Sequence, residues 1–190
     1  MIYFTSDLHL MHDKEFLYKP RGYSNVEEMC EFVISNINNR VKEDDTLYIL
    51  GDLMLNDLEK ATEYLKKIKC KNIYAILGNH DSDERRKIYE KLGIKCSYAE
   101  VVKYGKYTFI LTHWPMRVGN FDDKKKKPKF YNLCGHTHTS NKWTDFISMR
   151  AYHVELNAQN NLPVSVEKVI NDIENYRIPL FYRLFKNFVK

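Results

Sequence analysis

The first half of the chain alternates between short apolar runs and longer stretches in which apolar residues recur every three or four positions. The short runs are rich in Ile, Leu and Tyr, which is typical of buried strands, and the periodic stretches predict amphipathic helices. Ser24 can cap the first helix and Gly93 can end the last. Because strands and helices alternate, the strands should be parallel. We expect strands at 2–5, 46–50 and 72–77 and helices at 26–41, 57–68 and 83–92.

In the second half, strands follow one another with no helix between them. A turn at Gly105 joins two β-rich segments and predicts a β-hairpin. Ser165, followed by Glu167, is a suitable N-cap for a further helix. We therefore expect a mainly antiparallel second half and a mixed α/β fold for the whole chain. The expected strands are 97–104, 107–112, 130–134 and one or two within 146–156, with a loop at 114–129.

Two segments differ in character from the rest of the chain. We expect one domain over residues 1–178 and an amphipathic helical extension over 179–190, in which the apolar residues share one helical stripe. The favoured interpretation is that this extension docks on the core or on a second subunit, which would make a homodimer. A membrane-surface helix is the alternative. The lysine run at 124–129 predicts either a solvated loop or an electrostatic funnel for an anionic substrate.

Composition and charge narrow the class of protein without identifying it. Of the 190 residues, 44% are hydrophobic and 29% are charged, which fits a globular domain and excludes a disordered chain. No stretch approaches the ~18 apolar residues that span a membrane, and the N-terminus does not resemble a signal peptide. The four cysteines form no Cys-x-x-Cys pair, so we expect reduced thiols in a cytoplasmic protein. The net charge of +5 permits a polyanionic substrate without requiring nucleic acid.

Metal-binding side chains follow five of the predicted strands, at the point where each strand ends. Sites in open α/β sheets form outside the carboxyl ends of the strands, so these side chains should lie close together. Glycine precedes three of the five clusters, at Gly51, Gly78 and Gly135, where it allows a sharp turn or a close approach to a ligand. The candidate ligands are Asp7, His9, Asp52, Asn79, His113, His136 and His138.

This set of side chains points to divalent metals and to chemistry at phosphorus. Carboxylates and imidazoles without a motif cysteine suit Mn²⁺, Fe²⁺ or Zn²⁺. Seven ligands exceed the needs of one tetrahedral ion and suit two metals that share a carboxylate. Such a pair, about 3.5–4 Å apart, clamps an in-line displacement at phosphorus and lowers the pKa of a bridging water. His80 stands beside a ligand without being needed as one, so it is free to act as a general acid.

The motifs, taken in order, resemble those of the calcineurin-like metallophosphoesterase superfamily, and in particular its small capless bacterial and phage members. They are Asp7-x-His9, Gly51-Asp52, Gly78-Asn79-His80-Asp81, His113 and Gly135-His136-x-His138. The resemblance implies a two-sheet β-sandwich flanked by helices. It implies that one ion is held by Asp7, His9 and His138, and a second by Asn79, His113 and His136, with Asp52 bridging. His80 would contact the phosphate and protonate the leaving group, and Asp81 would orient His80.

The expected function is therefore that of a dinuclear metal-dependent phosphoesterase, in which a metal-activated hydroxide attacks phosphorus and His80 is the general acid. Manganese is the favoured metal, with iron, zinc or nickel as alternatives. Small nucleotide-type phosphodiesters are favoured because we expect no cap over the site, and a phosphomonoesterase or phosphoprotein phosphatase is the alternative. A nuclease has weak support from the lysine run, and a non-catalytic scaffold is disfavoured because no motif position is lost. Substrate contacts are expected from His12, Arg21 and Arg117.

Overall fold

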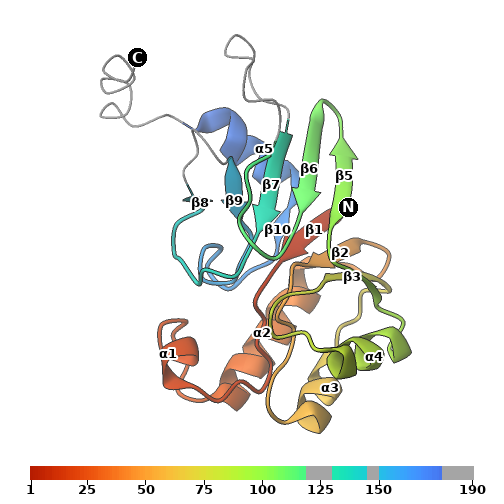
Figure 1. Cartoon of the computed structure of the whole chain (residues 1–190). Coiled ribbons are helices and arrows are strands. Elements are labelled where there is room, and N and C mark those ends of the chain that lie inside the picture. Colours follow the sequence, from red (N-terminus) through yellow and green to blue (C-terminus); the bar gives the residue numbers. More distant parts are fainter. Residues whose placement is uncertain (119–129, 145–149, 177–190) are drawn as a thin grey trace.

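Two five-stranded sheets pack face to face, and helices cover the outer face of the first sheet (Figure 1). The structure is a computed structural model, and it describes residues 1–118, 130–144 and 150–176. The expected α/β architecture of two sheets flanked by helices is confirmed. The lysine run at 124–129 and the extension at 179–190 lie outside the described residues.

The first sheet contains the parallel strands that the alternating pattern predicted. Its strands are β1 (Ile2–Thr5), β2 (Thr46–Ile49), β3 (Asn72–Ile76), β4 (Lys95–Ser97) and β10 (Val164–Ser165). The order is β10-β1-β2-β3-β4, and only β10 is antiparallel to its neighbour. We did not expect β4 as a separate strand or β10 at all, because segments of two or three residues are too short to show a period.

The second sheet corrects the expectation of a mainly antiparallel half. Its strands are β5 (Glu100–Tyr104), β6 (Tyr107–Leu111), β7 (Phe130–Cys134), β8 (Trp143–Thr144) and β9 (Ala151–His153). The predicted hairpin β5–β6 is antiparallel, as is β8–β9, but β6–β7 and β7–β9 are parallel. Because β6 and β7 are parallel neighbours, they end at the same edge of the sheet. Both strands therefore deliver their polar residues to one place.

Of the five helices in the described residues, all but the first begin at a residue whose side chain caps the first turn. The helices are α1 (Glu15–Tyr18), α2 (Val26–Arg40), α3 (Leu58–Lys66), α4 (Asp83–Lys91) and α5 (Val166–Asn175). Ser165 caps α5 as expected, by accepting a hydrogen bond from the backbone N–H of Lys168. For α2 the cap is Asn25 and not Ser24, because the side chain of Asn25 accepts from Glu28 N. The single turn α1 was not expected.

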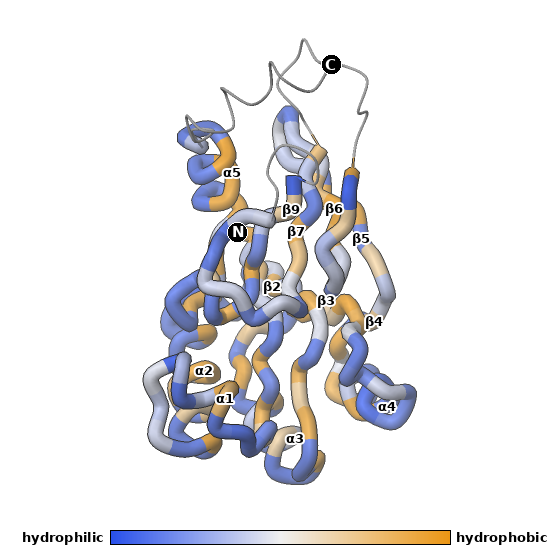
Figure 2. The backbone as a smooth tube through the Cα atoms, turned by 60° about the vertical axis from the view of Figure 1, so that its left-hand side comes forward, coloured by the Kyte–Doolittle hydropathy of each residue, from blue (hydrophilic) through white to orange (hydrophobic). Residues whose placement is uncertain are grey.

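Two apolar cores lie on the two faces of the first sheet. One core packs helix residues such as Met29 and Val33 of α2 against Leu47 of β2. The other packs Phe4 of β1 against Phe109 of β6, between the sheets. Figure 2 shows the same division, with apolar strands inside and a strongly polar α4 at the surface. Within the described part of the chain, no helix has the length and apolar character needed to cross a membrane.

Candidate metal centre

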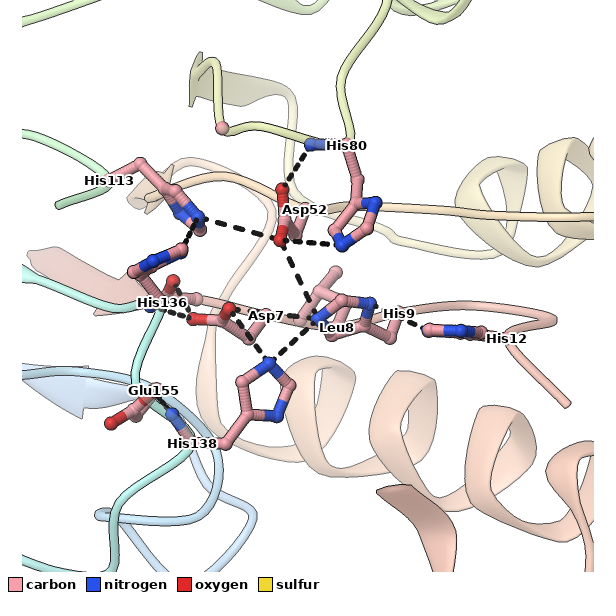
Figure 3. A network of polar contacts seen from close by, with 12 residues as sticks. Asp7, Leu8, His9, His12, Asp52, His80, His113, His136, His138 and Glu155 are labelled. Carbon is pink, nitrogen blue, oxygen red and sulfur yellow. Dashed lines mark hydrogen bonds and ion pairs between the residues drawn. The ribbon is translucent and has the colours of Figure 1, made fainter. Parts of the chain in front are cut away.

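The segments that follow β1, β2, β3, β6 and β7 meet at one edge of the two sheets, where most of the candidate ligands lie together (Figure 3). Backbone hydrogen bonds join these segments. Asp7 N donates to Gly51 O at 3.0 Å, and His9 N donates to Asp52 O at 2.9 Å. Parallel pairing of β1 with β2 therefore continues into the loops and holds their side chains side by side.

The first group of donor atoms comes from Asp7, His9 and His138. Asp7 Oδ1 lies 3.7 Å from His9 Nε2 and 3.5 Å from His138 Nε2, and the two imidazole nitrogens are 3.1 Å apart. Asp7 Oδ1 is buried and accepts no hydrogen bond from any described residue. Burial also lowers the pKa of His9 to about 4, so its ring is neutral near pH 7. A buried, unpaired carboxylate oxygen that faces two imidazoles is a suitable position for a cation.

The second group comes from Asn79, His113 and His136. His113 Nε2 lies 2.9 Å from Asn79 Oδ1 and 3.2 Å from His136 Nδ1. The other ring nitrogen, His113 Nδ1, lies 2.8 Å from the carbonyl oxygen of Leu50, so it carries the proton and donates to that oxygen. In the neutral ring, Nε2 is then an acceptor that faces the carbonyl oxygen of Asn79. Two acceptors in such close contact are stabilised by a cation between them, and imidazole and amide oxygen are both ligands for one.

Asp52 lies between the two groups. Its Oδ2 is 3.7 Å from His9 Nε2 and 3.5 Å from His113 Nε2, while its Oδ1 accepts from His80 N at 3.0 Å. Burial raises the pKa of Asp52 to about 6, and the electrostatic interaction with the nearby His113 opposes that shift. Burial makes this carboxyl group costly to ionise, and a nearby cation would stabilise its ionised form.

The donor atoms fit divalent ions in spacing as well as in kind. Donors on one ion at about 2.1 Å lie roughly 3.0–3.4 Å apart. The separations of 2.9–3.7 Å within the two groups and across Asp52 are close to that range. Oxygen and imidazole donors without thiolate suit Mn²⁺, Fe²⁺ or Zn²⁺. The residues present therefore fit the metal ions expected from the sequence.

Five of the ligand residues have left-handed backbone conformations, although none of them is a glycine. The φ angles are 58° at Asp7, 49° at His9, 55° at Asp52, 76° at His136 and 50° at His138. Each such residue costs on the order of 1–3 kcal/mol. Surrounding contacts must hold these loops in place, and three buried charged residues, Arg21, Asp81 and Glu155, supply them.

The three glycines of the motifs allow the ligand loops to touch each other. A Cβ added at Gly51 would lie 2.3 Å from His113 Nδ1, and one at Gly78 would lie 2.3 Å from Asp52 Oδ1. At Gly135 the added Cβ would lie 2.1 Å from Asp7 Oδ2. A close approach was expected at these positions, but here the groups approached are the candidate ligands themselves.

The position of Arg21 corrects its expected role in binding phosphate. Only 6% of the residue is exposed, and its guanidinium donates to the carbonyl oxygen of Asp7 at 2.8 Å and to Asn157 Oδ1 at 3.0 Å. Burial lowers its pKa to about 10, so it is charged near pH 7. Arg21 supports the Asp7–His9 loop from behind, and its guanidinium has no access to a substrate.

Asp81 also differs from expectation. Its carboxylate accepts hydrogen bonds from Asp52 N at 2.7 Å, Gly78 N at 2.9 Å and Leu53 N at 3.2 Å. The hydroxyl of Tyr89 donates a fourth, at 2.7 Å. Among the described residues, no hydrogen bond joins Asp81 to the ring of His80. The structure thus assigns Asp81 to holding the loops after β2 and β3 together, and this corrects the expectation that it orients His80.

Glu155 supports the loop after β7, which carries His136 and His138. The sequence analysis did not identify this residue. It is fully buried, and it accepts from His138 N at 2.7 Å, from Thr139 N at 3.0 Å and from the hydroxyl of Thr137 at 3.0 Å. His153 Nδ1 lies 3.2 Å from the same carboxylate. The one available signal was a carboxylate two residues after the apolar segment that forms β9, and this signal is weak because Glu155 belongs to no recognised motif.

The remaining expected residues lie around the ligands. His80 Nε2 is 4.0 Å from Asp52 Oδ2, and 41% of its side chain is exposed. His12 Nδ1 is 3.2 Å from His9 Nδ1, and the His12 ring lies 6.1 Å from that of His80. Arg117 is exposed in the segment after β6. Substrate contacts of His12 and Arg117 stay predictions.

Comparison with known proteins identifies the family. The model of the calcineurin-like phosphoesterase family matches residues 1–172. The uncharacterized protein MJ1445 of Methanocaldococcus jannaschii is 33% identical over 184 residues, which cover 93% of each chain. AQ665 of Aquifex aeolicus, a solved protein of unknown function, is 17% identical, with a TM-score of 0.65 over 90% of this chain and 98% of that one. The phosphoesterase Yfce of E. coli is 20% identical, with a TM-score of 0.46 over 81% and 77%.

The chain therefore belongs to the calcineurin-like phosphoesterase family, as its motifs indicated. The likeness to the Aquifex protein shows a shared fold at low sequence identity. Membership assigns the chain to a metal-dependent family of phosphoesterases, and the described residues supply groups able to hold metal ions.

Proposed function

We propose that the chain is a two-metal phosphoesterase that hydrolyses small phosphodiesters of the nucleotide type. One observation carries the proposal. Two groups of donor atoms meet at the carboxylate of Asp52, beside the half-exposed imidazole of His80. The first group, with a buried unpaired oxygen of Asp7, and the second, with the bare Nε2 of His113, each suit one divalent ion.

Bound there, two divalent ions supply an activated water and positive charge for the oxygens of the phosphate. We assign one ion to Asp7, His9 and His138, the other to Asn79, His113 and His136, and both to Asp52. Manganese is favoured, with iron, zinc or nickel as alternatives, because the donors are nitrogen and oxygen atoms. The four free thiols support a reducing compartment such as the cytoplasm.

His80 donates the proton that the departing oxygen needs. Its backbone is held at both ends, because His80 N donates to Asp52 Oδ1 and Arg85 Nη1 donates to His80 O at 2.8 Å. With the backbone held in this way, the ring lies beside the carboxylate of Asp52 and reaches solvent, where a leaving group can meet it. Asn79 and His136 are also exposed, which leaves room for a second substituent on phosphorus and favours a diester.

Hydrolysis of bis-p-nitrophenyl phosphate, measured beside p-nitrophenyl phosphate, tests the proposal. Metal-stripped protein should be inactive and should regain diester turnover when refilled with Mn²⁺. His80→Ala should keep its metal content and lose about 10²–10⁴-fold in turnover, whereas Asp52→Asn should lose metal as well. Asp83→Asn, at an exposed carboxylate on α4, is the matched control and should behave as wild type.

The outcomes separate the alternatives. Preference for the monoester would replace the diester assignment with a phosphomonoesterase. Absence of turnover of both substrates and of a wider panel of phosphate esters, in protein that binds two metals, would overturn the enzymatic proposal.

A further inference from the structure

A large exposed aromatic side chain adjoins the second group of ligands. Trp114 follows His113 directly and is 43% exposed. Its ring centroid lies 5.1 Å from that of His113, at an interplanar angle of 81°, and 6.1 Å from that of His136. The indole is therefore held beside the candidate metal centre while much of its surface remains open to solvent.

The backbone that carries Trp114 is fixed on both sides. Thr112 Oγ1 donates to Trp114 O at 2.8 Å, and Met116 N donates to Asn132 Oδ1 at 2.8 Å. Asn132 is fully buried on β7, and its amide donates to Ile110 O at 2.9 Å and to Thr112 Oγ1 at 2.8 Å. A ring on so firmly held a segment loses little conformational freedom when it binds a ligand.

The rings of Trp114 and His80 lie beside different groups of ligands. The ring of His80 lies 5.6 Å from that of His9 in the first group, whereas the indole adjoins His113 in the second. Asp52 lies between, with its Oδ2 4.0 Å from His80 Nε2 and 3.5 Å from His113 Nε2. If His80 protonates the departing oxygen, the substituent that lies toward Trp114 is the one that stays on phosphorus.

We propose that Trp114 is a stacking surface for a nucleobase on the part of the substrate that keeps the phosphate. This inference rests on the proposed function and narrows it to diesters that release a nucleoside monophosphate. Stacking of a base on an aromatic side chain changes affinity by about 5- to 150-fold and tolerates every base, because each has a π-face. Trp114 then gives the site a preference for substrates with a planar base, without selecting one particular base.

Binding of a product-like ligand tests the stacking surface without requiring turnover. The probes are adenosine 5′-monophosphate and ribose 5-phosphate, which differ by the base, with Mn²⁺-refilled protein in calorimetry. Wild type should bind the nucleotide about tenfold or more tightly than the sugar phosphate. Trp114→Ala should abolish that difference and leave the affinity for ribose 5-phosphate unchanged, and Trp114→Phe should retain most of it.

Fluorescence gives a second readout, because the chain has two tryptophans. In a Trp143→Phe background, adenosine 5′-monophosphate should quench the emission of Trp114 and ribose 5-phosphate should not. Tyr104→Ala is the control. It removes a partly exposed ring at the end of β5, where the hairpin turns away from the ligands, and should keep the preference for the nucleotide.

Equal binding of the two probes by wild type, or an unchanged preference in Trp114→Ala, would overturn the inference. The same preparations are assayed with bis-p-nitrophenyl phosphate. Diester hydrolysis without a base preference would reject the stacking surface alone. A Trp114-dependent base preference in a protein that hydrolyses no phosphate ester would reject the proposed function and leave a nucleotide-binding site.

Discussion

Replacing Asp81 by asparagine tests the assignment of this residue as the link between two ligand loops. The carboxylate is 8% exposed and accepts from the backbone N–H groups of Asp52, Gly78 and Leu53 and from the hydroxyl of Tyr89. Asparagine has nearly the same shape but replaces one acceptor oxygen by an NH₂ group. The substitution therefore removes hydrogen bonds without creating a cavity.

The magnitude follows from which bonds can be kept. The new NH₂ can donate to the hydroxyl of Tyr89, which then accepts, but it cannot accept from Leu53 N. One buried N–H left without a partner costs about 1–3 kcal/mol, and the remaining bonds lose the strengthening that a charged acceptor gives. We expect Asp81→Asn to lower the free energy of unfolding by about 2–4 kcal/mol. The loosened loop of Asp52 should also lower metal affinity by about 10- to 100-fold.

Urea unfolding of the metal-free protein measures the free energy of unfolding, and calorimetric titration with Mn²⁺ measures the metal affinity. Asp83→Asn, two residues away at the exposed start of α4, should stay within about 0.5 kcal/mol of wild type. An Asp81→Asn protein as stable as wild type, with normal metal binding and reduced turnover, would refute the assignment and favour a role in orienting His80.

Two further predictions concern packing and charge. Gly135→Ala should lower Mn²⁺ affinity tenfold or more in calorimetry, because the added Cβ would lie 2.1 Å from Asp7 Oδ2; unchanged affinity would show that the loop can move aside. For Asp172, burial raises the pKa, but hydrogen bonds led by those from Lys168 and Lys142 outweigh it and hold the pKa below its usual value. Its ionised form therefore stabilises the fold above about pH 4, and that contribution is lost as the pH falls through the lowered pKa. Urea unfolding should show Asp172→Asn less stable than wild type by about 1–2 kcal/mol at pH 7 and by less at pH 3, whereas a pH-independent difference would contradict this reasoning.

Much of the candidate site could be predicted because its signal is local. Asp7, Asp52 and His113 each follow an apolar run, and the end of a strand can be located within a few residues from the sequence alone. The proposed grouping of the ligands is supported by two distances, since Asp52 Oδ2 lies 3.7 Å from His9 Nε2 and 3.5 Å from His113 Nε2.

The residues that support the site could not be predicted in the same way. Arg21 looks in the sequence like any arginine of a polar loop, yet it is buried under the carbonyl oxygen of Asp7. Asp81 stands next to His80 in a motif, which suggested a direct contact, but two of its partners are backbone N–H groups 28 and 29 positions away along the chain. Glu155 belongs to no motif at all. Their roles depend on which loops pass beside them.

The sequence by itself determined helices α2 to α5, the parallel strands β1 to β3, and the Asp, Asn and His residues that follow the strand ends. These features follow from short-range patterns, because periodicity, capping and the residue after a strand involve neighbours along the chain. Only the tertiary structure decided that β7 runs parallel to β6 and β9, and that Arg21, Asp81 and Glu155 brace the ligand loops. Strand direction and the partners of a buried charge are set by groups far apart in sequence, whose contacts are made only when both sheets are in place.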